Sequence, residues 1–374
     1  MTSVIENLAL GRGPKRVVVK DTIDIAGHPT RAGSAALAEA APAGRHAEIV
    51  ARILAAGYRI VGKANLHELA FGMTGLNAWT GTPENPRFPA LIPGGSSSGS
   101  ATAVAAGLAD IGIGTDTGGS VRLPAACCGL YGLKPTFGRL DRRGVMPAIS
   151  SLDCVGPIAA DLEELIAFMA AVDSGFAMPA TQGPPRVARL DVEADDAIQD
   201  AVDEGLEASG LPMAPAALAL LDEAYNAAMA VINRETFDAC STWLEGGRIG
   251  ADVARRLRLA GETTDAEVRE AEGVRHAFAA EVDRLFEAYD LLALPTLPHA
   301  PLTREAAQAG QQDLTISALL RPFNLSGHPA LTLPLASREG YPMALQLVGR
   351  RGGDAGLCRA ALHLAVASRA NATA

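Results

Sequence analysis

The sequence has few aromatic residues, few lysines and no long apolar run. Only 4% of its 374 residues are aromatic, and only four of its 32 basic residues are lysines, so that arginine supplies the other 28. No apolar stretch approaches the roughly 18 residues that a membrane-spanning helix needs. Residues 1–16 lack the basic-then-apolar order of a signal peptide. We therefore expect a cytoplasmic protein with no membrane segment, in which each of the few lysines is conspicuous.

Positive charge is also in deficit. The formal net charge is −10 and the acidic residues are scattered, which gives no support for binding to nucleic acid or to an anionic membrane. The five cysteines are odd in number and mostly lie in apolar surroundings, so we expect reduced, buried thiols (Cys127, Cys128, Cys154, Cys240 and Cys358). No cluster of His, Cys and Asp has zinc-binding spacing. We therefore expect no metal and no organic cofactor.

Strand and helix patterns alternate along the first part of the chain. Residues 16–20 (RVVVK) form a β-branched run typical of a strand, residues 47–56 have helical spacing and end before Gly57, and residues 58–63 predict the next strand. Residues 161–172 predict an amphipathic helix that Asp161 caps. We expect a helical turn at 66–71 and helices at 252–259 and 266–289. A strand with a proline loop is expected at 290–301, further strands at 331–334 and 344–348, and a closing helix at 355–368.

Strands near both ends of the chain, with helices between them, predict one mixed sheet assembled from distant segments. The predicted fold class is α/β, with a central mixed β-sheet covered by helices on both faces. We expect a single domain over residues 1–374, with a core formed by 1–173 and 290–374 and a helical middle region at 174–289.

The stretch from Pro93 to Thr136 carries nearly all the chemistry that can be read from the sequence. Two glycine-flanked serine sites, Gly94–Gly99 and Gly118–Ser120, lie on either side of a segment that predicts a small-residue helix and a short buried strand. Glycines let a ligand approach the main chain closely. Because the chain passes through this helix and returns along this strand, Ser96 and Ser120, which are 24 residues apart, can lie at the same edge of a sheet. This arrangement indicates an active site.

Several chemistries could use these serines. Gly95–Gly99 fits the G-x-S-x-G elbow of α/β-hydrolases, and downstream histidines keep that interpretation open (His276, His299, His328 and His363). A proline-rich segment stands where the elbow needs a strand, which weakens it. Gly112–Gly114 begins like a dinucleotide fingerprint but lacks its later glycine. A neutral lysine acting as base toward a serine is the remaining arrangement, with Lys20 and Lys63, each at the end of an apolar strand, as candidates.

Ordered motifs across most of the chain resemble the amidase signature enzymes, which include small-amide hydrolases, fatty-acid amide hydrolase and the A subunit of glutamyl-tRNA amidotransferase. The matching segments are Val17–Asp21, Val61–Asn65 with Glu68, Asn85–Pro86, Gly94–Gly99, Gly114–Arg122, Pro124–Ala126, Gly132–Thr136, Phe323–Ala330 and Gln346–Gly349. The middle region matches only in character. Only 19 residues precede Lys20, so we expect the helical N-terminal portion of most members to be largely absent.

The resemblance implies a role for each matched site residue. Ser120 would be the nucleophile, Ser96 a bridging serine after a cis Gly95–Ser96 bond, and Lys20 the base, which leaves Lys63 structural. The main-chain N–H groups of the loop would form an oxyanion hole (Thr117, Gly118, Gly119 and Ser120). Ser97, Asp116 and Arg122 would support the site, the last two as an ion pair that braces the loop. Phe71, Met73 and Trp79 are the large side chains expected near the substrate, of which Phe71 and Met73 are assigned to binding it.

The resemblance implies an amidase that hydrolyses a linear C–N bond of a small-molecule amide through a Ser120 acyl-enzyme. The scarcity of aromatic residues favours a small or medium acyl group. An esterase or carbamate hydrolase with the same site, an amidotransferase A-type subunit that supplies ammonia to a partner protein, and a catalytically silent scaffold are the alternatives. A homodimer is compatible with the sequence.

Overall fold

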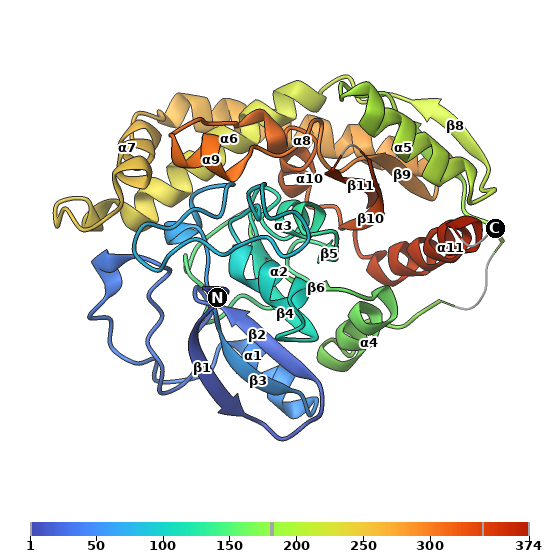
Figure 1. Cartoon of the computed structure of the whole chain (residues 1–374). Coiled ribbons are helices and arrows are strands. Elements are labelled where there is room, and N and C mark those ends of the chain that lie inside the picture. Colours follow the sequence, from blue (N-terminus) through green and yellow to red (C-terminus); the bar gives the residue numbers. More distant parts are fainter. Residues whose placement is uncertain (1, 180–182, 339, 373–374) are drawn as a thin grey trace.

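The computed structural model describes residues 2–179, 183–338 and 340–372, and within them one eleven-stranded sheet has the spatial order β1-β3-β2-β4-β6-β5-β10-β11-β9-β7-β8 (Figure 1). The strands are β1 (Val4–Leu10), β2 (Arg16–Lys20), β3 (Arg59–Ala64), β4 (Ile111–Asp116), β5 (Tyr131–Lys134), β6 (Cys154–Ala159), β7 (Val187–Leu190), β8 (Met213–Ala216), β9 (Leu291–Pro295), β10 (Ala330–Arg338) and β11 (Tyr341–Val348).

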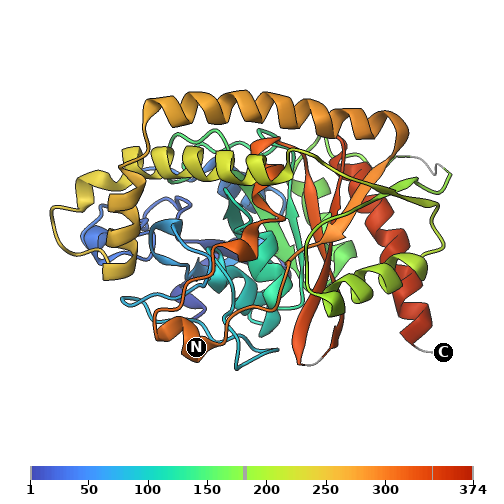
Figure 2. The ribbon, with the colours of Figure 1, turned by 90° about the horizontal axis from the view of Figure 1, so that it is seen from above.

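Helices cover both faces of this sheet. They are α1 (Glu48–Ala55), α2 (Ser98–Ala105), α3 (Arg122–Cys127), α4 (Leu162–Val172), α5 (Asp196–Glu207), α6 (Leu221–Cys240), α7 (Ala251–Ala260), α8 (Asp265–Ala288), α9 (Arg304–Gln308), α10 (Arg321–Leu325) and α11 (Asp354–Ala372). The core on one face packs α1, α4, α5 and α11 against the strands, and the core on the other face includes α6, α7, α8 and α10. Figure 2 shows the long helices α6 and α8 lying side by side. The predicted fold class is confirmed.

Local sequence explains several of these elements. The β-branched run of β2 is buried from Val17 to Lys20, as a central strand requires. The Asp161 carboxylate caps α4 by accepting hydrogen bonds from the N–H groups of Glu163 and Glu164. Helix α1 ends as expected before Gly57, whose φ of 82° is a left-handed conformation that glycine adopts without strain. All five cysteines are buried and free, as predicted.

Parallel pairing of the central strands positions the site. β2 lies between β3 and β4 and runs parallel to both, with Lys20 opposite Ala64 and Val19 opposite Ile113. The carboxyl ends of parallel strands meet at one edge of a sheet. This register therefore brings Lys20, at the end of β2, beside the end of β4 and the glycine-rich loop that follows it.

Five strands were not predicted, namely β1, β5, β6, β7 and β8. β1 (VIENLAL) mixes polar and apolar residues, and it pairs antiparallel with β3 at the sheet edge. The middle region is not wholly helical, because β7 and β8 extend the sheet beyond β9. β8 (MAPA) has low strand propensity and contains Pro215, which is tolerated because this strand is at the edge. Within the described residues, no helix is long and apolar enough to cross a membrane.

Candidate active site

Lys20 contacts two hydroxyl groups at the end of β2. Its Nζ lies 2.8 Å from Ser96 Oγ and 2.8 Å from Thr115 Oγ1. Burial lowers the pKa of Lys20 to about 7, although the charges of Asp153 and Asp116 act in the opposite direction. The cause is that the ammonium form loses its hydration in the interior. Near neutral pH a large fraction of Lys20 is therefore a free amine that can accept a proton.

The other buried lysines have different partners. Lys63 Nζ lies 2.6 Å from the Asp21 carboxylate and donates to the Pro29 carbonyl at 2.7 Å, so its partners are oxygen acceptors away from the serines. Lys134 Nζ donates to the Pro135 carbonyl at 3.0 Å, and burial lowers its pKa. Of the lysines in the part of the chain that the structure describes, Lys20 alone hydrogen-bonds to a serine. The two candidates left open by the strand pattern are thus distinguished by their partners.

The Gly94–Gly99 loop brings its serines to the end of β4. The Gly95–Ser96 peptide bond is cis, as expected. Ser97 Oγ accepts from the Thr115 N–H and donates to the Thr115 carbonyl, each at 3.3 Å, and the Ser97 N–H donates to the Ser120 carbonyl at 3.2 Å. Ser97 is fully buried, and the described segment before it forms no strand. This geometry argues against a hydrolase elbow at Ser97 and gives that residue a supporting position.

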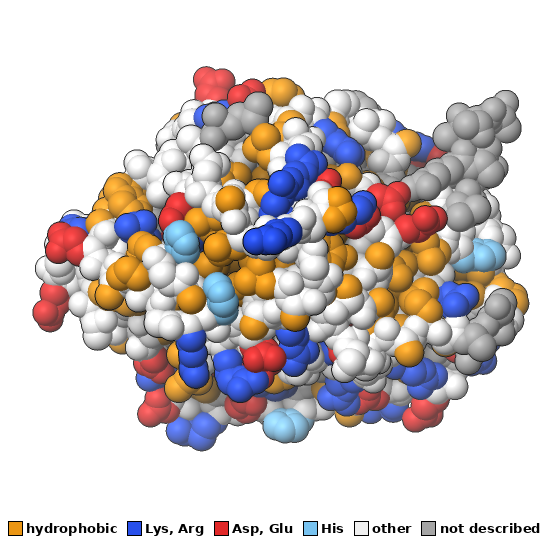
Figure 3. Space-filling model, turned by 90° about the horizontal axis from the view of Figure 1, so that it is seen from below, with side chains coloured by type: hydrophobic (Ala, Val, Ile, Leu, Met, Phe, Trp, Pro, Cys, Tyr) orange, Lys and Arg blue, Asp and Glu red, His pale blue; other side chains and the backbone are white. Residues whose placement is uncertain are grey.

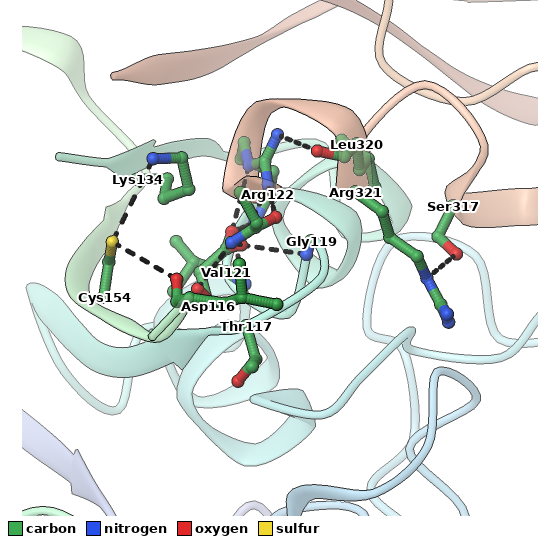
Figure 4. A network of polar contacts seen from close by, with 12 residues as sticks. Asp116, Thr117, Gly119, Val121, Arg122, Lys134, Cys154, Ser317, Leu320 and Arg321 are labelled. Atoms are coloured by element: carbon green, nitrogen blue, oxygen red, sulfur yellow. Dashed lines mark hydrogen bonds and ion pairs between the residues drawn. The ribbon is translucent and has the colours of Figure 1, made fainter. Parts of the chain in front are cut away.

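Arg122 braces the loop that follows β4. All five of its side-chain N–H donors have acceptors, a condition that a buried guanidinium needs to offset its lost hydration. Figure 4 shows Arg122 beside Asp116 and Leu320. Nε and Nη2 contact the Asp116 carboxylate at 3.0 and 2.9 Å, and the remaining bonds reach the Leu320 carbonyl, Gln346 and Asn324. Burial alone would raise the pKa of Asp116, but Arg122 outweighs it and holds that pKa well below its usual range. The predicted ion pair is present.

The loop between Asp116 and Arg122 presents backbone donors beside Ser120. The Gly119 N–H already donates to Asp116 Oδ1 at 2.8 Å, so the oxyanion-hole role expected for Gly119 is not supported. Among residues 2–179, 183–338 and 340–372, the N–H groups of Thr117, Gly118 and Ser120 have no acceptor. The Thr117 hydroxyl donates to Asp153 at 2.9 Å, which fixes the start of this loop. The described hydrogen bonds do not include one between Ser96 Oγ and Ser120 Oγ.

A pocket opens beside Ser120. The predicted residues Phe71, Met73, Thr117 and Gly118 line it together with Ser120. The remaining lining residues are Ala70, Gly72, Met229, Ile232, Asn233, Arg256 and Arg321. Trp79, expected near the site, is 43% exposed and does not line the pocket.

The sequence did not indicate the pocket residues that α6, α7 and α10 contribute, because these residues lie far from the serine motifs along the chain and none falls inside a matched segment. Thr115 was also missed as a partner of Lys20, although it lies inside the matched Gly114–Arg122 segment. The feature that could have identified Thr115 is its hydroxyl group near the end of β4, the strand that pairs with β2. In the described chain, no group of three or more His, Cys, Asp or Glu side chains could hold a metal ion.

Comparison with known proteins gives consistent matches. The profile of the Amidase family matches residues 16–196 and 186–358. The A subunit of the glutamyl-tRNA(Gln) amidotransferase of Natronomonas pharaonis is 34% identical over 92% of this chain and 93% of its own length. A crystal structure of an amidase superposes with a TM-score of 0.84 at 30% identity, over 96% of this chain and 86% of that one. A protein from a complex described as vestigial, related to an s-triazine catabolic enzyme, superposes with a TM-score of 0.87 at 28% identity, over 96% and 85%.

Proposed function

The chain belongs to the Amidase family, and on that premise we propose that it hydrolyses the linear C–N bond of a small or medium amide through an acyl-enzyme on Ser120. The observation that carries the proposal is the 2.8 Å hydrogen bond between Lys20 Nζ and Ser96 Oγ. It joins a buried lysine, whose pKa is lowered to about 7, to the loop that contacts Ser120. A base poised near neutral pH is what general-base catalysis needs.

In the proposed first half-reaction, neutral Lys20 accepts the proton of Ser96 while Ser96 accepts the proton of Ser120. Ser120 Oγ forms a bond to the amide carbonyl carbon, and the carbonyl oxygen becomes an oxyanion. The N–H groups of Thr117, Gly118 and Ser120 supply the hydrogen bonds that stabilise this charge. The support for this role is that none of these three N–H groups has an acceptor within the described part of the chain, and that all three residues line the pocket.

Collapse of the tetrahedral intermediate breaks the C–N bond. The Lys20 ammonium returns its proton through Ser96 to the leaving nitrogen, so that the amine departs neutral. Water then attacks the Ser120 ester, its proton passes through Ser96 to Lys20, and the carboxylic acid is released as Ser120 recovers a proton. Lys20, Ser96 and Ser120 therefore return to the protonation states in which they began, and the only reactants are the amide and one water molecule. An ester or a carbamate could be cleaved by the same steps.

The nucleophile is tested with Ser120→Ala. We expect the variant to fold and to lose ammonia release from simple primary amides by several orders of magnitude. A fluorophosphonate probe should add to Ser120 of the wild type, as located by mass spectrometry of proteolytic peptides. Ser100→Ala is the matched control, because Ser100 Oγ donates only to the Ile113 carbonyl at 2.9 Å. An adduct on Ser97 would refute the assignment.

A second candidate function is that of an amidotransferase component that passes ammonia from glutamine to a partner protein. The identity to A subunits of glutamyl-tRNA(Gln) amidotransferases favours it. The two functions differ in what they require. A hydrolase releases ammonia from its amide when purified alone, whereas the amidotransferase function predicts co-purification of partner proteins from the native host and a preference for glutamine over other amides.

A further inference from the structure

Two arginines line the pocket beside Ser120. Arg256 comes from α7 and Arg321 from α10, so two helices far apart in the sequence bring positive charge to one cavity. No Asp or Glu is among the residues that line this pocket. Lining residues with two cations and no anion form an environment that favours a negatively charged ligand.

Arg321 is buried, yet most of its donors have no protein acceptor. Its Nε donates to Ser317 Oγ at 2.7 Å, and its guanidinium lies 5.4 Å from the centre of the Tyr225 ring. The bond to Ser317 is the one side-chain hydrogen bond that Arg321 makes in the described chain, whereas all five side-chain donors of the neighbouring Arg122 are paired. Figure 4 shows the Arg321 guanidinium pointing away from the Arg122 network. Its two Nη groups are therefore available to a ligand in the pocket.

Arg256, which is partly buried, also lacks acceptors for its guanidinium donors in the described chain. Its guanidinium lies 4.7 Å from the centre of the Phe71 ring, and it makes no hydrogen bond or ion pair with the residues that the structure describes. The nearest acidic side chain that acts on it is Asp252, which is 55% exposed and does not line the pocket. Burial lowers the pKa of Arg256 and lowers that of Arg321 to about 10, and the two charges repel. An anion between them would relieve both penalties.

We propose that Arg256 and Arg321 bind a carboxylate of the substrate, so that the preferred amides are half-amides of small dicarboxylic acids. This inference rests on the proposed hydrolysis at Ser120, because the same pocket must hold the scissile bond. Guanidinium groups pair with carboxylates through two parallel N–H···O bonds, and buried pairs of this kind are stronger than neutral hydrogen bonds. A free ammonium group on the substrate has no carboxylate partner among the lining residues and meets the two arginines as a like charge.

The substrate test uses amides that share one scissile group. Malonamate, succinamate and glutaramate carry a carboxylate, whereas propanamide, butanamide and pentanamide are their neutral counterparts, and glutamine is glutaramate with an added ammonium group. We expect kcat/KM for ammonia release to be at least about tenfold higher for the best half-amide than for its neutral counterpart, and higher for glutaramate than for glutamine. Equal or higher rates for the neutral amides would overturn the proposal.

Variants test whether the arginines cause this preference. Arg321→Met and Arg256→Met should each reduce the ratio of half-amide to neutral-amide kcat/KM by about tenfold, through a higher KM for the half-amide, and the Lys variants should restore part of it. Arg186→Met is the matched control, because Arg186 pairs with Asp290 at the surface and lies outside the pocket. A ratio that stays the same in both Met variants contradicts the proposal.

A binding test separates this inference from the hydrolysis mechanism. Glutarate, which has no amide to cleave, should slow fluorophosphonate labelling of Ser120 in the wild type and in Arg186→Met but not in Arg321→Met. Protection by glutarate in a protein that cleaves none of the amides would support the anion site while the proposed function fails. Labelling that glutarate does not slow, in a protein that cleaves neutral amides, would refute the anion site and leave the proposed function intact.

Discussion

At the scale of single residues, partners decide what each buried lysine can do. Lys63 faces the Asp21 carboxylate at 2.6 Å, whereas Lys20 faces two hydroxyls and has a pKa lowered to about 7, so it loses part of its positive charge near neutral pH. The same side chain thus makes a buried ion-pair contact in one place and is a candidate base in the other. The difference arises because a nearby anion offsets the cost of burying an ammonium group, and a hydroxyl offsets much less of it.

This difference predicts a pH profile. The neutral amine is the active form of Lys20, so kcat/KM should fall as pH drops through the lowered pKa near 7 and should level off above it, well below the value of about 10.4 for a free lysine. The measurement is kcat/KM for one neutral amide from pH 5 to pH 9.5. Lys20→Met should lose activity by several orders of magnitude.

Lys63→Met is the control for that experiment. It leaves Asp21 buried without its cation and should lower stability, measured by urea unfolding, while the acid limb of the rate profile keeps its midpoint. A folded but inactive Lys63→Met beside an active Lys20→Met would mean that the two roles are exchanged.

At the scale of elements, the loop after β4 is held by parts of the chain that lie about 200 residues away, through contacts with separations of 198 to 224 residues. Arg122 begins α3 and contacts the Leu320 carbonyl before α10 and Gln346 in β11. The Asn324 side chain also donates to the Asp116 carbonyl at 2.7 Å. These bonds tie the Ser120 loop to α10, the helix that carries Arg321. The loop geometry and the pocket wall therefore depend on one buried network.

Breaking this network should be costly. Arg122→Met leaves the buried Asp116 carboxylate without its cation, and we expect it to lower the free energy of unfolding by about 3–5 kcal/mol. Urea unfolding of the wild type and the variant measures the loss. The double variant Asp116→Asn/Arg122→Met should lose less than the sum of the two single variants, because it leaves no unpaired charge. A loss within about 0.5 kcal/mol for Arg122→Met would contradict the role assigned to the pair.

At the scale of the whole molecule, distant segments share one sheet. The middle region contributes β7 and β8 to the sheet and contributes the pocket residues Met229, Ile232, Asn233 and Arg256. On the face seen in Figure 3, positive and negative side chains alternate with hydrophobic ones rather than forming a field of one sign. The shared sheet and the shared cores support the proposal that residues 1–374 form a single domain.

A single domain predicts a single unfolding transition. The two tryptophans report on separate parts, since Trp79 lies in the predicted core and Trp243 in the middle region. Variants with one tryptophan each (Trp243→Phe and Trp79→Phe) should give the same midpoint of urea unfolding by fluorescence, after correction for the stability of each variant. Phe278→Ala, which removes a fully buried ring of α8 next to Phe323, should lower the free energy of unfolding by about 3–5 kcal/mol and shift both midpoints together to lower urea concentration. Two separate transitions would indicate two domains.

The fold and the site differ in how far local sequence predicts them. The strand at Arg16–Lys20 and the helix capped by Asp161 follow from short-range patterns, because β-branched runs and capping carboxylates act within a few residues. β1, β7 and β8 lack such patterns, and their pairing with distant strands stabilises them instead. The serine motif was readable because its glycines and hydroxyls lie within one stretch of the chain.

The sequence by itself determined the α/β class, the family and the residues of the serine-rich stretch, since all of these are recorded in local patterns. Only the tertiary structure decided which lysine meets Ser96, that the Gly119 N–H is occupied by Asp116, and that Arg256 and Arg321 line one pocket. The physical reason is that the pKa of a lysine, the availability of a donor and the charge of a cavity depend on neighbours in space. Those neighbours come from α6, α7, α10 and β4, and their side chains meet only when the sheet and its two helical layers have assembled.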